Sequence, residues 1–77
     1  MFTPQALRAA RGLLNWGVRD LGRAAGVAWT TVSQFENGRA MRRSTAEKLT
    51  RALKARGVEL IVSDDLSGAV MVRPRSG

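Results

Sequence analysis

Apolar and small residues recur with helical spacing over much of the first 57 residues. Their positions are Leu7, Ala10, Leu14, Leu21, Ala25, Val32, Phe35, Ala46, Leu49, Ala52 and Leu53. Separations of three and four residues place successive apolar side chains on one helix face, so this pattern predicts amphipathic helices. After residue 57, β-branched residues become frequent and apolar positions alternate with polar ones. That change predicts two strands, in residues 58–63 and 69–73.

Capping signals mark the bounds of the first two helices. Thr3 suits the N-cap and Pro4 the first helical position, so the first helix should run from Pro4 to about Asn15. Gly17 marks the bend before a second helix over residues 18–25. Gly26 should end that helix, because glycine readily adopts the left-handed conformation of a C-terminal cap.

Residues 18–37 carry the most information in the chain. The third helix, residues 28–36, should stop at Asn37 and Gly38, which both tolerate a left-handed backbone. The positions expected to be buried here are Leu21, Gly22, Ala25, Val27, Val32 and Phe35. The positions off that stripe are Trp29, Thr30, Ser33 and Gln34. Two short helices joined at a glycine, with polar side chains outward on the second, are typical of a DNA-binding helix-turn-helix.

Local sequence signals also mark the start and the end of the fourth helix. Residues 39–43 are expected to form a basic loop before it. Ser44 and Glu47 have the spacing of a capping box, in which each side chain accepts a hydrogen bond from a free backbone amide. The helix should extend to about Arg56, where Gly57 closes it.

The residues after Gly57 are expected to form a β-hairpin that turns at residues 64–68, with a frayed end at 73–77. Leu60, Val62, Val70 and Val72 would form one apolar face, with Ile61 and Met71 on the other. A two-stranded hairpin cannot bury both faces on one small helical body, and a free strand edge can pair with another chain. Dimerisation through residues 58–77 is therefore the preferred interpretation. The alternative is a hairpin folded onto the first and fourth helices of its own chain.

Composition narrows the function. The formal net charge is +7, with eleven arginines and two lysines, which indicates a polyanionic partner unless it merely reflects a soluble basic protein. The chain has no cysteine and no histidine, so we expect no enzyme activity, no metal site and no cofactor. It shows no signal peptide and no membrane span, which favours a cytoplasmic protein. Basic residues are spread over several elements, which argues against binding along a membrane surface.

Residues 4–57 resemble the Xre-type, lambda-repressor-like helix-turn-helix family of short bacterial or phage regulators. The resemblance is carried by Leu-Gly-Arg-Ala-Ala-Gly-Val, residues 21–27, and by Thr-Val-Ser-Gln-Phe-Glu-Asn-Gly, residues 31–38. It implies a compact four-helix DNA-binding domain, residues 1–57, in which the hairpin of residues 58–77 replaces a fifth helix. It also implies a homodimer on an inverted repeat of double-stranded DNA.

The same resemblance implies roles for the outward residues of the third helix. Trp29, Thr30 and Ser33 would face the bases, and Gln34 would contact a base or a phosphate. Trp29 stands where the family usually has a polar or basic residue. It would press on a thymine methyl or the sugar backbone, or fold back to cover Ala28 and the second-helix side of the core.

Phosphate contacts are expected on both sides of that helix. The candidates are Arg19, Arg23, Asn37, Arg39, Arg42 and Arg43. A salt bridge from the loop arginines to Glu36 or Glu47 is the structural alternative, and Asn37 has the plainer role of turning the chain. Gly17 and Val18 stand where the family usually has a capping Ser or Thr and a phosphate-binding Gln, and Ala28 where it has another capping residue.

These observations predict a small homodimeric transcriptional regulator, with repression more plausible than activation because binding would occlude a promoter. The rival class is an antitoxin- or antiactivator-type module whose main task is to sequester a partner protein. A neighbouring toxin gene, or a purified chain that stays monomeric with an apolar C-terminal segment, would favour that rival.

Overall fold

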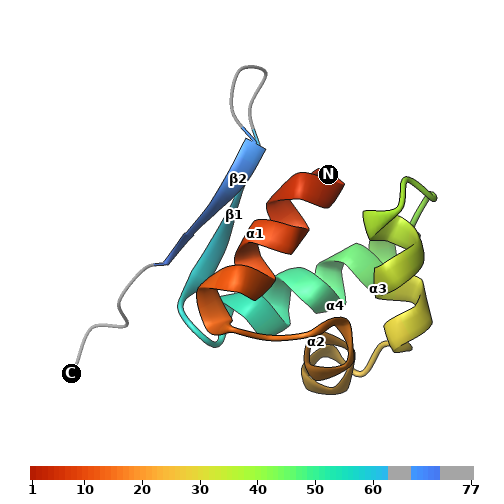
Figure 1. The fold of residues 1–77 in the computed structure, drawn as a ribbon, viewed down its shortest axis with the longest axis horizontal. Helices are drawn as coiled ribbons and strands as arrows, with labels where there is room; N and C mark the ends of the chain where they lie inside the picture. The colour runs from red at the N-terminus through yellow and green to blue at the C-terminus, as the bar shows by residue number, and fades with distance from the viewer. Residues whose placement is uncertain (63–66, 72–77) are drawn as a thin grey trace.

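The computed structural model describes residues 1–62 and 67–71 of the 77-residue chain (Figure 1). Its elements, in chain order, are α1 (Pro4–Leu14), α2 (Val18–Ala25), α3 (Trp29–Glu36), α4 (Arg43–Lys54), β1 (Val58–Val62) and β2 (Ser67–Met71). The expected mainly helical fold class is confirmed. The predicted turn at residues 64–68 and the frayed end at 73–77 lie largely outside the described residues.

The first helix follows its capping signals. Thr3 has an extended backbone, and its hydroxyl oxygen accepts a hydrogen bond from the Ala6 amide at 3.1 Å. Pro4 occupies the first turn, where its missing N–H removes no helical hydrogen bond. Asn15 ends α1 in the left-handed conformation, with φ of 55°. The predicted bounds of this helix are confirmed.

Two glycines shape the junction between α2 and α3. Gly26 ends α2 in the left-handed conformation, with φ of 70°. Gly22 lies against the start of α3, because a Cβ atom placed on it would come within 2.6 Å of the Val27 carbonyl oxygen. At the far end of α3, only Gly38 is left-handed, with φ of 96°, whereas Asn37 has φ of −97°. Asn37 therefore does not adopt the left-handed backbone conformation that the sequence allowed for it.

The capping box predicted at Ser44 and Glu47 is wrong. The helix begins earlier, at Arg43, and Arg42 is its N-cap with an extended backbone. The Arg42 carbonyl already accepts a helical hydrogen bond from the Ala46 amide at 3.0 Å, so Ser44 lies inside the first turn and cannot cap it. The helix also ends at Lys54, two residues before the expected end.

The core lies where α1, α3 and α4 converge. Its buried apolar residues are Phe2, Ala6, Leu7, Ala10, Leu21, Val32, Phe35, Ala46, Leu49, Leu53 and Val58. Most of the predicted inward positions are among them, while Leu14, Ala25 and Val27 are half-buried against this core. The pattern missed Phe2, whose ring meets that of Phe35 edge-on at 5.5 Å between centroids.

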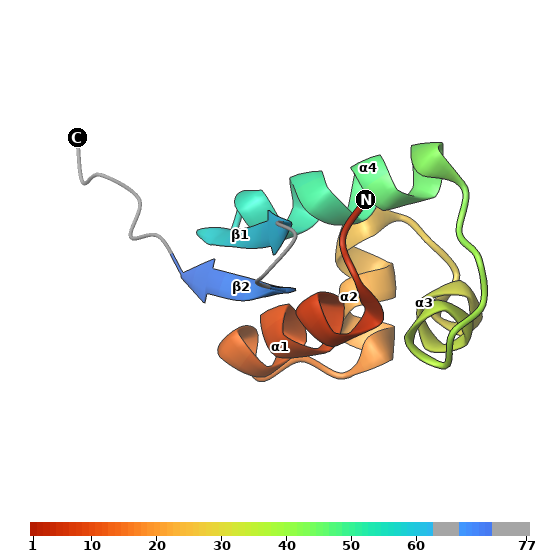
Figure 2. The same cartoon turned by 90° about the horizontal axis from the view of Figure 1, so that it is seen from above.

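The two strands pack on helices of their own chain. They pair antiparallel, β2 lies along α1, and β1 contacts both α1 and α4 (Figure 2). Val58 is fully buried, and Leu60 packs against the core. This arrangement is the alternative to dimerisation stated above, because one face of the strands packs on α1 and α4 of the same chain.

The register corrects the predicted faces of the hairpin. Met71 is opposite Val58, and Val70 is opposite Glu59. Residues directly opposite in an antiparallel pair share a face, so Val70 does not share the face of Leu60 as predicted. Ile61 is 38% exposed, on the face away from the core. The side chains of Val62, Val70 and Met71, and all of Val72, lie outside the described part of the chain.

Candidate nucleic-acid interface

Helix α3 exposes polar side chains on the face opposite its core contacts. Val32 and Phe35 are buried and determine how the helix is rotated. Thr30 and Gln34 are exposed, and Ser33 is half-buried. Thr30 and Gln34 are four residues apart, so they lie one turn apart on the same helix face. The structure thus brings the predicted base-reading residues together, with Ser33 the least accessible of them.

At the N-terminal end of α3, an aromatic ring and a cation form a pair that the sequence pattern did not predict. Trp29 is the first residue of α3 and is 42% exposed. The guanidinium carbon of Arg19, on α2, lies 4.7 Å from the centroid of its ring. Trp29 therefore lies against α2, and it leaves a substantial part of its ring open to solvent.

All five predicted phosphate-binding arginines are exposed. Arg19 and Arg23 lie on α2, Arg39 and Arg42 lie between α3 and α4, and Arg43 begins α4. Arg43 was expected in the loop, and the early start of α4 places it in the helix instead. Within residues 1–62 and 67–71, none of these five arginines forms an ion pair.

The acid nearest to Arg39 along the chain is already neutralised from α1. Glu36 is only 8% exposed. Arg11 donates to both of its carboxylate oxygens, at 2.7 Å from Nε and 2.6 Å from Nη2. Arg8 lies 3.6 Å from the same carboxylate and donates to the Glu36 carbonyl oxygen at 2.9 Å. Both arginines of α1 therefore contact the C-terminal residue of α3.

Arg11 is stabilised in its charged form by this arrangement. Its hydrogen bond to Glu36 raises the pKa of the guanidinium, the nearby carboxylate charge acts in the same direction, and burial opposes both. Arg11 also donates to the Trp16 carbonyl oxygen at 2.9 Å. One signal in the sequence pointed to this role: Arg8 and Arg11 are three residues apart and so share a helix face.

Asn37 has a local structural role. Its side-chain nitrogen donates to the Ser33 carbonyl oxygen at 2.8 Å, which satisfies one of the last carbonyl groups of α3. The Asn37 side chain is exposed. α3 ends at Asn37 as predicted, but the end is stabilised by this side-chain hydrogen bond and not by a left-handed backbone at Asn37.

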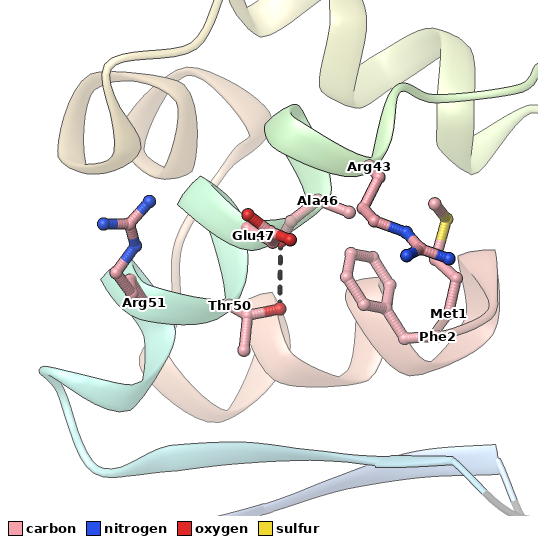
Figure 3. Close-up of a pocket in the computed structure, with 7 residues that line it drawn as sticks. All are labelled: Met1, Phe2, Arg43, Ala46, Glu47, Thr50 and Arg51. Atoms are coloured by element: carbon pink, nitrogen blue, oxygen red, sulfur yellow. Dashed lines mark hydrogen bonds between the residues drawn. The ribbon is translucent and has the colours of Figure 1, made fainter.

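A separate pocket of about 740 Å³ lies between the N-terminal residues and α4 (Figure 3). It is lined by Met1, Phe2, Arg43, Ala46, Glu47, Thr50 and Arg51. The Thr50 hydroxyl donates to the Ala46 carbonyl oxygen at 2.9 Å, so this polar group is already satisfied. Of the predicted site residues, only Arg43 borders this pocket.

Two further features, a metal-binding cluster and a membrane-spanning helix, are absent from the described part of the chain. No group of three His, Cys, Asp or Glu residues there is arranged to hold a metal ion. No helix there is long and apolar enough to cross a membrane. Comparisons with protein-family models, with curated proteins and with solved structures found no match to this chain. The function is therefore inferred from the residues of this chain alone.

Proposed function

We propose that the protein binds double-stranded DNA sequence-specifically through α3 and acts as a small homodimeric transcriptional regulator. The observation that carries this proposal is the charge arrangement around α3. Exposed polar residues of α3 lie between two groups of exposed arginines that form no ion pair among the described residues. Glu36, the carboxylate nearest to Arg39 along the chain, is buried and bound to Arg11, so it does not offset the charge of Arg39.

The dimensions of α3 suit the major groove. An α-helix with its side chains is about 10–12 Å in diameter, and the major groove of B-DNA is about 12 Å wide. Thr30 and Gln34 would contact base edges, since a glutamine amide can pair with both N6 and N7 of adenine. Arg19 and Arg23 would approach the phosphates on one side of the groove, and the arginines after α3 those on the other.

Gln34 is expected to contribute to sequence discrimination. Once an operator has been selected from a random duplex pool, Gln34→Ala should weaken specific binding by about 1–3 kcal/mol and leave nonspecific binding nearly unchanged. Its side chain is exposed, so the melting temperature should change little. Gln5→Ala, which removes the same exposed side chain from α1, is the matched control. Equal losses for specific and nonspecific duplexes would exclude base contact by Gln34.

The arginines after α3 are expected to act through charge alone. Arg42→Gln should weaken binding to all duplexes alike and reduce the log–log salt slope by about 0.9 for one lost phosphate contact. The substitution keeps the helix start, because among the described residues the Arg42 side chain forms no cap. Lys54→Gln removes one charge at the opposite end of α4 and should leave the slope unchanged. An equal change in both variants would refute a local role for Arg42.

Homodimer formation is proposed through the strand face that α1 and α4 leave uncovered. Glu59 and Ile61 lie on this face, and Ile61 is an exposed large apolar side chain. Ile61→Lys should convert a dimer into a monomer at micromolar concentration, measured by sedimentation, because it places a charge in the interface. Gln5→Lys adds the same charge on α1 and should leave the dimer intact. A wild-type chain that sediments as a monomer would remove the homodimer from the proposal.

A further inference from the structure

Trp29 is an apolar group in a polar surface. Among the described residues, Met1, Leu13, Trp29 and Ile61 are the exposed large apolar side chains, and Trp29 is the one on α2 or α3. Exposing this much apolar surface is unfavourable in water. Trp29 directly precedes Thr30 and lies one helical turn before Ser33, so it borders the face proposed to enter the groove.

Trp29 is held at two points, its backbone and its ring. At its backbone, a Cβ atom on Gly22 would lie 3.2 Å from both the Cα and the nitrogen of Trp29, so α2 contacts the start of α3 directly. At its ring, the Arg19 guanidinium lies over one face, 4.7 Å from the centroid. A planar guanidinium stacks well on an aromatic ring, and this contact limits the rotamers open to the indole. Trp29 remains 42% exposed, so part of its side chain is still open to solvent.

The major groove offers one kind of apolar group to such a ring. Base edges there present hydrogen-bond donors and acceptors, together with the C5-methyl group of thymine. We therefore propose that Trp29 contacts a thymine C5-methyl group and that Arg19 is the positioning residue for this contact. This inference rests on the proposed function, because it requires α3 to lie in the groove.

Arg19 has a second consequence for the same contact. Its side chain is exposed, so its charge is open to the DNA backbone while its plane covers the indole. Lysine in its place keeps the charge and loses the planar stacking surface. Arg19→Lys therefore removes the positioning of Trp29 and keeps the attraction to phosphate. A purely electrostatic role for Arg19 predicts no change in the contact of Trp29 with thymine in this variant.

The test replaces each thymine of the selected operator, one at a time, with deoxyuridine, which lacks only the methyl group. Wild-type protein should lose about fourfold in affinity at one thymine of each half-site, the factor that corresponds to about 0.8 kcal/mol for one buried CH₂-sized group. Trp29→Ala should show no loss at that position, and Trp29→Phe should retain part of it. Arg19→Lys should lose most of this discrimination while keeping its salt slope. Arg56→Lys, which makes the same change at a guanidinium 5.4 Å from the centroid of the Trp16 ring, should keep the wild-type discrimination.

Each outcome decides the inference. Wild-type binding that is indifferent to every deoxyuridine, or a loss that persists unchanged in Trp29→Ala, overturns the methyl contact and leaves DNA binding standing. Discrimination that is intact in Arg19→Lys overturns the positioning role. An enriched operator without a constant thymine overturns the inference as well. Failure to enrich any duplex overturns the proposed function itself, and the methyl contact with it. Melting curves for the variants show whether each one is folded.

Discussion

Glu36→Ala is expected to lower the free energy of unfolding by about 3–5 kcal/mol, because it leaves the charge of Arg11 partly buried without a partner. The Arg11 side chain is 17% exposed and the Glu36 side chain 6% exposed. The two hydrogen bonds between them join α1 to the C-terminal end of α3. A chain of this size has a total stability of about 4–12 kcal/mol, so the variant should be largely unfolded at moderate denaturant concentrations.

The matched control is Arg8→Ala. Arg8 lies 3.6 Å from the same carboxylate, but its side chain is 58% exposed. An exposed ion pair contributes about 0–1 kcal/mol, and the hydrogen bond of Arg8 to the Glu36 carbonyl adds a contribution of similar size. Chemical denaturation of both variants measures the difference. Equal destabilisation by Glu36→Ala and Arg8→Ala would contradict a dominant Arg11–Glu36 pair.

The pH dependence of the Arg11 contribution follows from the direction of its shift. Its pKa is raised in the folded chain, chiefly by the hydrogen bond to Glu36. A raised pKa means that the stabilising proton is fully bound below the ordinary pKa of the guanidinium, and its contribution is lost only as the pH rises through the folded-state value. The destabilisation caused by Arg11→Ala should therefore be constant from neutral to moderately alkaline pH.

Gly22→Ala is expected to destabilise the fold by about 3 kcal/mol and to abolish specific DNA binding. The added methyl group would lie 2.6 Å from the Val27 carbonyl oxygen and 3.2 Å from two backbone atoms of Trp29. Backbone atoms cannot turn aside as a flexible side chain can, so α2 and α3 must move apart. That movement would displace Trp29 from Arg19 and change the orientation of the whole exposed face of α3.

Gly12→Ala makes the same chemical change without the collision. Gly12 lies within α1, and a Cβ atom there meets nothing within 4 Å. Alanine is favoured over glycine within a helix by about 0.5–1 kcal/mol, so this variant should be more stable than the wild type. Thermal melting of both variants gives the comparison. A Gly22→Ala chain as stable as Gly12→Ala would show that the α2–α3 junction has room that the structure does not indicate.

The sequence by itself determined where the helices form and which of their faces are buried. Thr3 with Pro4, and Gly26, are local signals whose meaning depends on backbone geometry within a few residues, and the first two helices follow them. The spacing of Val32 and Phe35 likewise sets the buried side of α3. Local signals of this kind can be interpreted without knowledge of the tertiary structure because the interacting groups are neighbours along the chain.

Only the tertiary structure decided the contacts between distant residues. Arg11 and Glu36 are 25 residues apart, and the helix face that Arg11 shares with Arg8 does not identify Glu36 as their partner. The stacking of Arg19 on Trp29 depends on the close approach of two helices at Gly22. The strands pack on α1 and α4 of their own chain. Hydrophobic alternation predicts a buried face without identifying the surface that covers it.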